Sequence, residues 1–545
     1  MSAETQANTL DLKAAKNTSF SIKAVSKRVL RIAPWVVGLG LVFAIYTSGL
    51  SKNPRGFFMD ESCTAYNAYL LAHTGAGEFG PRFPFFFEVY RGEYVQYYHP
   101  VDEYLLALVF LFRSPSILLV RMYSTFLMFS ACVLLGFLAK RISGSYLIGC
   151  IIGAFALVTP WFFEVGRLAW EAHLVPLLTI LFLYALYRAQ RKERWSLLDI
   201  SLIVLSLGLL TYCYASGRAL GPLMAAGLVF FATTRKQIIA VATTWTLYAV
   251  TLLPAFLFGQ QHPGVLMKRF IETSYLRTTI PLGDNLNRFI DRFLEDQSLI
   301  GLLLTGDLHS RHHLQGSGGA FFYSIFAIVV IGFVIVVARR RNDPWWRFVL
   351  YGLAAAIVPG AITSWPTHAL RLLAWPVFLL LLAVPGLEWF LARKPNLLAS
   401  SSAEPAKADD DRRSTTESFV PRPVLLSLLV IVLGFCAVET YWFQTVYRRE
   451  GPKREGEFDV DYKKAYDAAV NQSSRPIYLE DGRWGPGYIH ALWYATLEKR
   501  PTSEFTYLPS GSKAPSGAVV ISTSDVCEGC ETITRAYVYH VYRAP

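Results

Sequence analysis

Two adjacent carboxylates, Asp60 and Glu61, stand shortly after the first long apolar stretch of the sequence. If that stretch crosses a membrane, both lie near its surface, where ionisable side chains are costly and commonly serve a function. A carboxylate there can act as a general base on an acceptor hydroxyl, or it can help to bind a metal ion. It can also cap the N-terminus of an interfacial helix, and the sequence leaves both roles open.

Further polar side chains stand near the ends of other apolar stretches, often next to glycine, proline or aromatic residues. Basic side chains donate charge-assisted hydrogen bonds to phosphate oxygens, so we expect this set to bind a phosphate or a sugar. Glycines around Arg311 and His312 would let the backbone approach such a ligand closely. The predicted binding residues are His99, Arg167, Glu171, Arg218, Lys268, Arg269, Asp307, Arg311, His312, His368 and Arg371.

Several of these residues also have a purely structural interpretation. Arg167 and Arg218 stand at predicted helix ends, where arginine readily extends its charge to the membrane interface. Lys268 and Arg269 suit a solvated helix in a loop. Glu171 stands four residues after Arg167, which is the spacing of an ion pair within one helix.

The sequence leaves open whether the protein binds a metal ion. The neighbouring histidines His312 and His313 are candidate ligands, although an adjacent pair lacks the usual ligand spacing. No cofactor is therefore certain, and the candidate is a divalent metal ion.

The composition excludes a water-soluble enzyme. Of the 545 residues, 53% are hydrophobic and only 17% are charged. A helix needs about 20 apolar residues to cross a bilayer core about 30 Å thick. The stretches that we predict to be membrane spans are 32–50, 120–139, 146–163, 172–188, 196–214, 219–233, 238–258, 320–338, 347–363, 370–392 and 423–443.

The basic residues predict the orientation of these spans. The formal net charge of +12 comes from short clusters between apolar stretches and not from one basic face, so we expect no nucleic-acid partner. The clusters fall on the same side of the membrane as the N-terminus, and the positive-inside rule assigns that side to the cytoplasm. The long loops 51–119 and 259–319 then lie outside, and the short apolar segment Val101–Phe112 is a juxtamembrane or half-inserted helix.

These features predict an all-α polytopic membrane protein with about eleven spans and a small C-terminal α/β domain. A cytoplasmic tail 1–31 precedes the membrane domain 32–392, and a flexible cytoplasmic linker 393–422 leads to the last span 423–443. The soluble domain 444–545 lies outside the cytoplasm. Its predicted helices are near 462–470 and 488–498, and its predicted strands are near 476–479, 518–522 and 537–542.

Two short motifs in this C-terminal domain suggest chemistry at first sight. Asp459-Val460-Asp461 matches the metal-binding string of soluble nucleotide-sugar transferases, but it precedes a predicted helix, where helix capping explains it. Cys527 and Cys530 form the one closely spaced cysteine pair. Outside the cytoplasm such a pair more often forms a local disulfide than half of a zinc site.

Over roughly residues 30–390, the sequence resembles the membrane glycosyltransferases of the GT-C class, especially bacterial family 39 proteins related to protein O-mannosyltransferases and aminoarabinose transferases. The order, the spacing and the shared outer location of several elements carry the resemblance. These elements are Asp60-Glu61, His99-Pro100, Thr159-Pro160-Trp161 with Gly166-Arg167 and Glu171, Tyr214 with Arg218 and Pro222, Gly306-Asp307 with Arg311-His312, and His368-Ala369-Leu370-Arg371 with Pro376.

The resemblance implies a GT-C fold and transfer of a sugar from a polyprenyl phosphate outside the cytoplasm, with inversion at the anomeric carbon. It implies that Asp60 is the catalytic carboxylate, and we predict that Glu61 assists or positions it. Aminoarabinose transferases end their first outer loop with a Glu-x-Lys-Pro element. Here His99-Pro100 stands in its place, as in the protein mannosyltransferases, which puts the metal site of the aminoarabinose enzymes in doubt.

Two functional hypotheses follow. The first is a hexosyl- or pentosyltransferase of the bacterial inner membrane, whose acceptor is a lipid, a glycan or a protein. The alternative is a polytopic transporter or lipid flippase. Transporters usually contain internal repeats and broken helices with charges at the bilayer midplane. In this sequence we find no repeat, and the polar residues concentrate on one side of the membrane, which favours the enzyme.

Overall fold

The computed structural model describes residues 34–392, 421–524 and 527–545. The predicted tail 1–31 and nearly all of the predicted linker 393–422 lie outside the described residues. The chain divides into two compact units, residues 1–49 and 50–545, which we describe separately. In the first unit the described residues form one short apolar helix, Pro34–Tyr46.

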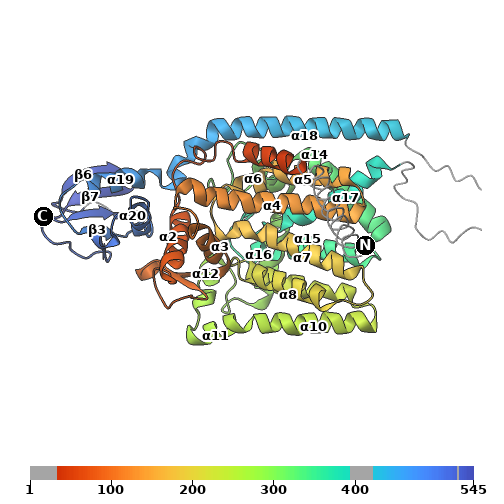
Figure 1. Ribbon diagram of the computed structural model, residues 1–545, viewed down its shortest axis with the longest axis horizontal. Coiled ribbons are helices and arrows are strands. Elements are labelled where there is room, and N and C mark those ends of the chain that lie inside the picture. The colour runs from red at the N-terminus through yellow and green to blue at the C-terminus, as the bar shows by residue number, and fades with distance from the viewer. Residues whose placement is uncertain (1–33, 393–420, 525–526) are drawn as a thin grey trace, which may run out of the picture. The chain divides into compact units, whose positions relative to one another are not determined.

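The second unit is mainly a bundle of apolar helices, which confirms the predicted fold class (Figure 1). Each predicted span from 120–139 onward contains a helix. The bundle helices are α4 (Ile117–Ser143), α5 (Tyr146–Val158), α6 (Pro160–Gly166), α7 (Leu174–Gln190), α8 (Leu197–Thr211), α9 (Gly217–Ala226), α10 (Arg235–Thr251), α11 (Leu253–Gln261), α14 (Tyr323–Ile335), α15 (Pro344–Ala355), α16 (Val358–Ala361), α17 (Trp375–Leu391) and α18 (Arg422–Glu450).

Fewer helices than predicted are long enough to span a membrane unbroken. Among the described residues, 5 helices pass by length and apolar composition, and a pair bent by 60°, α5 with α6, can count as a sixth. The bend coincides with Pro160, which has no amide hydrogen to continue the helix. The other predicted spans form shorter helices, some of them interrupted by proline or glycine.

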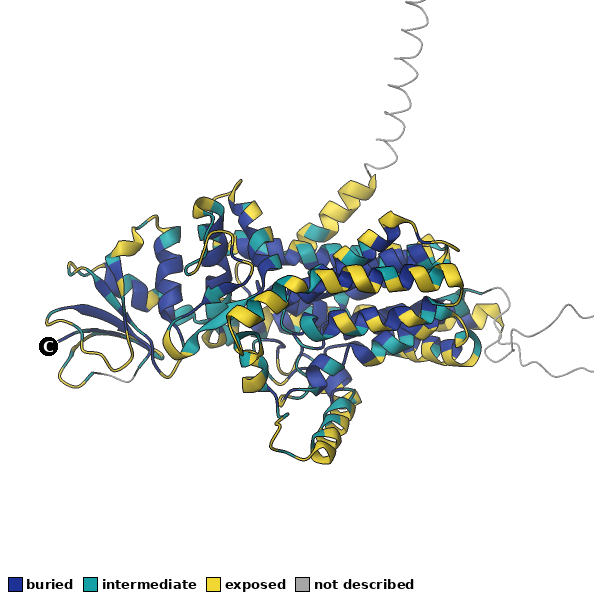
Figure 2. Ribbon diagram, turned by 90° about the horizontal axis from the view of Figure 1, so that it is seen from below, coloured by how far each residue is buried: buried dark blue, intermediate teal, exposed yellow. Residues whose placement is uncertain are grey.

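Close helix packing rests on glycines that face a neighbouring backbone. A Cβ on Gly332 of α14 would lie 1.7 Å from the carbonyl oxygen of Leu382 in α17, and one on Gly386 would lie 2.3 Å from that of Ile328. Small residues allow this approach in membrane bundles, where dispersion and close packing replace the hydrophobic effect between helices. In Figure 2 the ribbon carries the colour of buried residues where helices face one another and the colour of exposed residues along the outer faces.

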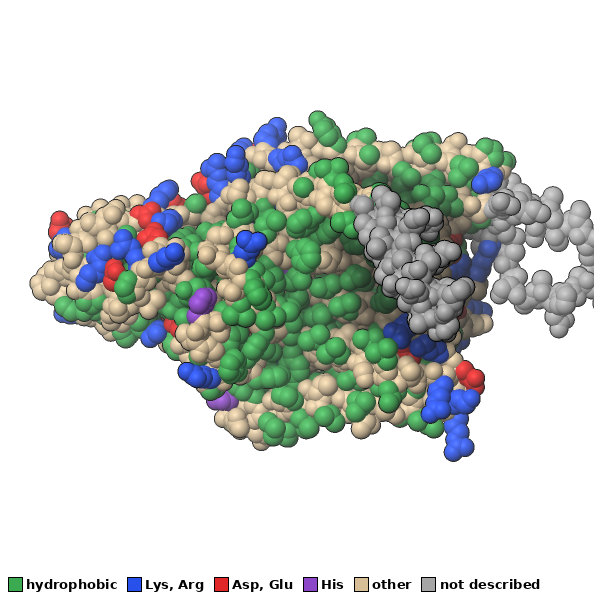
Figure 3. Space-filling model, viewed as in Figure 1, with side chains coloured by type: hydrophobic (Ala, Val, Ile, Leu, Met, Phe, Trp, Pro, Cys, Tyr) green, Lys and Arg blue, Asp and Glu red, His purple; other side chains and the backbone are tan. Residues whose placement is uncertain are grey.

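The surface of the bundle suits a lipid environment. On the face drawn in Figure 3, hydrophobic side chains cover the helices, whereas charged side chains gather at the two ends of the bundle and on the C-terminal domain. At the end away from that domain, the connection between α7 and α8 contacts the start of α10, because Lys236 pairs with Glu193 at 2.7 Å. The protein is therefore an integral membrane protein.

At the opposite end, two long loops fold over the bundle. The first contains α2 (Met59–Thr74), β1 (Phe87–Val89), β2 (Gln96–Tyr98) and α3 (Pro100–Phe110), and the second contains α12 (Val265–Thr273) and α13 (Leu282–Glu295). The helix predicted at Val101–Phe112 is α3. Its 11 residues are too few to cross a bilayer.

The C-terminal domain is a five-stranded mixed sheet with two helices. The strand order is β4-β3-β5-β7-β6, with β3 parallel to β4 and β5 and the other neighbours antiparallel. Its elements are α19 (Val460–Val470), β3 (Ile477–Glu480), α20 (Tyr488–Leu497), β4 (Phe505–Leu508), β5 (Val519–Ser522), β6 (Glu531–Ala536) and β7 (Tyr539–Arg543). Cys527 and Cys530 form the predicted local disulfide.

The sequence analysis missed two of the strands, β4 and β6. The largely exposed strand β6 carries Glu, Thr and Arg side chains and has no apolar run. The domain also shares one hydrophobic core with the first long loop. Trp493 of α20 contacts Phe57 and Phe110, with ring centroids 5.9 Å and 6.4 Å apart.

Candidate active site

A cavity of about 690 Å³ opens between the two long loops, the bundle and the C-terminal domain. This volume is in the range of pockets that bind small organic ligands. Its walls come from α2, the segment around β2, the α6–α7 connection, the start of α9, α12, residues 309–312, residues 359–371 and Gly485-Pro486 of the C-terminal domain.

Most of the predicted site residues line this cavity, although they are spread over some 300 residues of sequence. Those that line it are Asp60, His99, Glu171, Arg218, Lys268, Arg269, Arg311, His312, His368 and Arg371. Glu61, Arg167 and Asp307 are buried and are absent from its lining.

Asp60, in the first turn of α2, presents its carboxylate to the cavity. One of its oxygens accepts hydrogen bonds from the hydroxyls of Tyr90 at 2.8 Å and Tyr98 at 3.0 Å. Burial, and then the nearby Asp60 charge, raise the pKa of both tyrosines well above the usual range. Both hydroxyls therefore stay protonated and keep donating to Asp60, which fixes the direction of its carboxylate.

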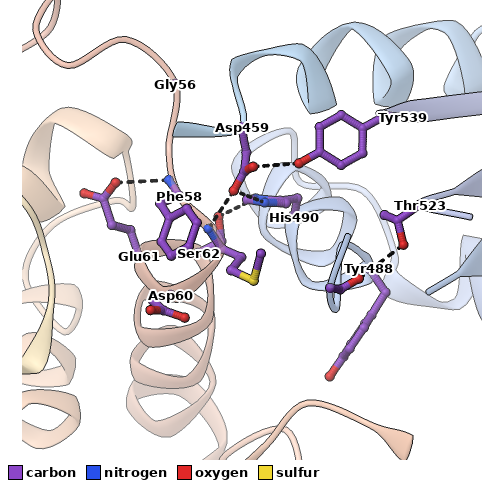
Figure 4. Close-up of polar contacts among 12 residues, drawn as sticks. Gly56, Phe58, Asp60, Glu61, Ser62, Asp459, Tyr488, His490, Thr523 and Tyr539 are labelled. Carbon is purple, nitrogen blue, oxygen red and sulfur yellow. Dashed lines mark hydrogen bonds and ion pairs between the residues drawn. The ribbon is translucent and has the colours of Figure 1, made fainter. Parts of the chain in front are cut away.

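Glu61 leaves α2 on a different side from Asp60 (Figure 4). Its side chain is fully buried and accepts two hydrogen bonds from Arg121 of α4, at 3.0 Å and 2.8 Å. It also accepts the backbone amides of Phe58 and Ala169. Through the Phe58 contact, Glu61 caps the N-terminus of α2, whereas Asp60 lines the cavity.

His99 and Glu171 join the first loop to the α6–α7 connection. Glu171 accepts from the backbone amide of His99 at 2.5 Å, and its other oxygen lies 3.2 Å from His99 Nδ1. The alternative prediction, that Glu171 pairs with Arg167 within one helix, is wrong because α6 ends at Gly166. Arg167 packs instead over the ring of Phe163, with its guanidinium carbon 4.9 Å from the centroid.

Basic side chains from α9 and α12 close another wall. Arg218 donates to the carbonyl of Leu266 at 2.6 Å, and Lys268 donates to the carbonyl of Val95 at 2.7 Å. These contacts tie α12 to the bundle and to the first loop. Arg269 is more exposed and pairs with Glu272 at 3.6 Å.

Several buried nitrogens of cavity-lining side chains have no hydrogen-bond partner among the described residues. Buried donors are normally paired, because leaving one unpaired costs about 1–3 kcal/mol. Two of them belong to guanidinium groups, so the unpaired set favours an anionic ligand. These atoms are His99 Nε2, Trp170 Nε1, Arg311 Nε, His368 Nδ1 and Arg371 Nη1.

Asp307, His312 and His368 are the one group of three or more possible metal ligands in the described part of the chain, with ligand atoms within 4.8 Å of one another. The carboxylate of Asp307 is already occupied, however. It accepts from His312 Nδ1 at 2.6 Å and from the amides of Ala369 and His309 at 2.7 Å and 2.9 Å. As folded, the group contains an Asp–His pair in which Asp307 already holds His312 Nδ1 and two backbone amides.

His313, the second histidine considered as a metal ligand, lies outside this group. Its Nδ1 contacts Glu164 of α6 at 2.8 Å, and its Nε2 donates to the carbonyl of Gly318. Glu164 also pairs with Arg454, which follows α18, at 3.2 Å. This buried network anchors the loop that carries Arg311 and His312.

Sequence reasoning missed some residues around the site. The signal for Arg121 was present, since it stands inside a predicted span, where a charge needs a partner. Tyr90 carried no such signal, and it reaches Asp60 only through the turn between β1 and β2. Gly485 and Pro486 of the C-terminal domain could not be connected with residues 400 positions earlier.

Comparison with known proteins gives a fold relationship. No protein-family model matches the sequence, and no curated protein matches it. Among solved structures, ArnT from Cupriavidus metallidurans in the apo state matches with a TM-score of 0.54 and 12% identity, over 94% of this chain and 98% of ArnT. ArnT bound to undecaprenyl phosphate matches with a TM-score of 0.56 and 10% identity, over 93% and 98%.

A third matching structure belongs to a longer protein. The archaeal oligosaccharyltransferase AglB from Archaeoglobus fulgidus, in complex with an inhibitory peptide and a dolichol-phosphate, has a TM-score of 0.50 and 12% identity. The alignment covers 88% of this chain and 64% of AglB. At these identities the likeness concerns the fold, and the chain therefore has a GT-C-like membrane fold.

Proposed function

We propose that this protein is an integral membrane glycosyltransferase. It moves a sugar from a polyprenyl-phosphate-linked donor to an acceptor hydroxyl on the outer side of the membrane. The observation that carries the proposal is one cavity with a tyrosine-oriented carboxylate, Asp60, and unpaired buried guanidinium donors of Arg311 and Arg371.

The chemistry needs both parts of this cavity. Asp60 takes the proton from the acceptor hydroxyl as its oxygen attacks the anomeric carbon. The bond from that carbon to the phosphate oxygen breaks, and the electron pair leaves with the polyprenyl phosphate. Basic side chains stabilise the charge that develops on this leaving group. A single displacement of this kind inverts the anomeric configuration.

Glu61 contributes by position and not by contact, because its oxygens are used by Arg121 and by backbone amides. Arg167 lies outside the cavity lining, so we do not include it among the phosphate ligands. His312, held by Asp307, is included. A divalent metal ion at Asp307, His312 and His368 would supply a further positive charge to the phosphate.

The structural relatives support the class of donor. ArnT was solved with undecaprenyl phosphate and AglB with a dolichol-phosphate, both of which are polyprenyl phosphates. A lipid-linked donor stays in the bilayer, so its sugar is presented near the membrane surface. We place the protein in the bacterial inner membrane with its N-terminus in the cytoplasm, on the distribution of the basic clusters.

The experiment uses the full chain in lipid nanodiscs with a panel of undecaprenyl-phosphate-linked hexoses and pentoses. Lipid, glycan and peptide acceptors are offered, and mass spectrometry detects the glycosylated product. We expect Asp60→Asn to lower transfer at least about 100-fold, the usual size of a lost general base. Asp284→Asn, which changes an exposed carboxylate of α13, is the matched control and should keep full activity.

Two results would overturn the proposal. One is unchanged transfer in Asp60→Asn, which removes Asp60 from the mechanism. The other is movement of the lipid-linked sugar across the membrane, measured with the protein in sealed liposomes, with no new glycosidic bond for any donor of the panel. The second result would identify a transporter or flippase instead.

A further inference from the structure

Asp459, in the string Asp459-Val460-Asp461, does not have the role that its position suggests. It stands at the N-cap of α19, as predicted, but its side chain makes no capping hydrogen bond, so the capping prediction is wrong. Its backbone is in the left-handed region, with φ at 51°, a conformation that aspartate tolerates better than most residues. The carboxylate is thereby free to contact another part of the chain.

That other part is the first turn of α2. One oxygen of Asp459 accepts the backbone amide of Met59 at 3.1 Å and lies 3.2 Å from His490 Nε2 (Figure 4). The other oxygen accepts from the hydroxyl of Tyr539 at 2.6 Å. A carboxylate only accepts, so Nε2 of His490 carries the hydrogen. Asp459 thus connects the C-terminal sheet with the residue next to Asp60.

His490 of α20 extends the contact by one more residue. Its side chain is fully buried, and Nδ1 lies 2.8 Å from the hydroxyl of Ser62. The ring therefore lies between Asp459 on one side and Ser62 on the other. The C-terminal domain therefore holds Met59 and Ser62, which flank the carboxylate pair on both sides.

The backbone just before α2 is also pressed against the C-terminal domain. Gly56 has a φ of +82°, and a Cβ at this position would lie 2.0 Å from the carbonyl oxygen of Phe458. Glycine is therefore required here for close approach. Gly485, which lines the cavity, lies over Met59, since its Cβ would come within 3.1 Å of the methionine methyl carbon.

We propose that Asp459 and His490 are positioning residues for Asp60, which makes the C-terminal domain a working part of the transferase site. The inference rests on the proposed function. Asp60 is held from two sides, because Arg121 of the bundle binds Glu61 while Asp459 and His490 bind Met59 and Ser62. Without the second hold, the first turn of α2 can shift relative to the acceptor hydroxyl.

The string itself offers a matched pair of variants. Asp461, two residues on, pairs with Lys464 and contributes no contact to α2 among the described residues. We expect Asp459→Ala to lower kcat about 10- to 100-fold, since a displacement of about 1 Å at a reacting group can cost 100-fold. Asp461→Ala should stay within about twofold of wild type.

Two features separate positioning from general damage. Asp459→Asn keeps an oxygen that can accept from Met59, so it should recover most of the kcat that Asp459→Ala loses. The KM for the undecaprenyl-phosphate-linked sugar should stay within about twofold in all three variants, because the donor-binding wall is untouched. Equal loss of kcat in the alanine and asparagine variants would overturn the inference.

Amide hydrogen exchange tests the inference without any activity. In Asp459→Ala and His490→Ala, the amides of Met59 to Ser62 should exchange at least about tenfold faster than in wild type. Tyr542→Phe is the control, since it removes a hydrogen bond to Glu480 within the same sheet and should leave these amides unchanged. Unchanged exchange in Asp459→Ala overturns the inference, whereas absent transfer by the wild type overturns the proposed function alone.

Discussion

The first turn of α2 and the cavity wall that faces it differ in how completely their polar groups are paired. The carboxylate of Glu61, the hydroxyl of Ser62 and the backbone amide of Met59 all have partners, in Arg121, His490 and Asp459. On the cavity side, buried nitrogens of several side chains have none among the described residues. We call the paired groups, Glu61, Ser62 and Met59 with their partners Arg121, His490 and Asp459, the frame of the site. The unpaired nitrogens mark where a ligand is expected.

The largest expected effect is the loss of stability when the partner of Glu61 is removed. Arg121→Ala leaves the buried carboxylate of Glu61 without its counter-charge, and breaking a buried pair costs about 3–5 kcal/mol of stability. We expect little folded protein and a clearly lower melting temperature in detergent, measured by fluorescence during heating. Arg141→Ala removes an exposed arginine at the other end of α4 and should melt like wild type. Equal melting temperatures of the two variants would contradict the assignment of Arg121 to the frame.

A smaller effect is expected for a residue of the cavity wall, where a substitution should change ligand affinity and leave stability unchanged. Arg371→Ala removes the buried unpaired Nη1, and a charged hydrogen bond contributes about 1.5–3 kcal/mol. The Kd for undecaprenyl phosphate should therefore rise about 10- to 100-fold, measured by microscale thermophoresis in nanodiscs, with the melting temperature unchanged. The exposed and paired Arg269 is the comparison, and Arg269→Ala should change the Kd less than about threefold. A melting temperature that falls with no change in Kd would instead assign Arg371 to the frame.

The smallest effect concerns pH. Glu78 of the first loop accepts from the Tyr488 hydroxyl of the C-terminal domain, and Asp481 lies close by in that domain. Burial raises the pKa of each acid to about 7, from about 4 in an unfolded chain. Between these values the folded protein binds more protons, so this contribution to stability is full below about pH 4 and is lost as the pH rises through 7.

The wild type should accordingly melt a few degrees higher at pH 6 than at pH 8. The double variant Glu78→Gln with Asp481→Asn should flatten that difference, whereas Glu531→Gln, at an exposed pair with Arg543, should keep it. The same pH dependence in wild type and double variant would contradict this account.

Much of the candidate site could be predicted from the sequence, because membrane proteins restrict where charge is placed. Asp60 was selected by its type and its position after an apolar stretch, and His99 and Arg371 by similar placement. The structure brings these three around one cavity. The prediction could not separate Asp60 from Glu61, since adjacent helix residues point about 100° apart and only the surroundings show which direction faces the cavity.

Local sequence patterns predict the apolar helices, the charged ends of the bundle, and the small α/β domain after the last long helix. These follow from local composition and from the length that a bilayer requires. The tertiary structure alone decided that Arg121 neutralises Glu61 and that Asp459 reaches Met59 from 400 residues away. Such contacts depend on how helices and domains pack, and short-range sequence patterns carry no information about that packing.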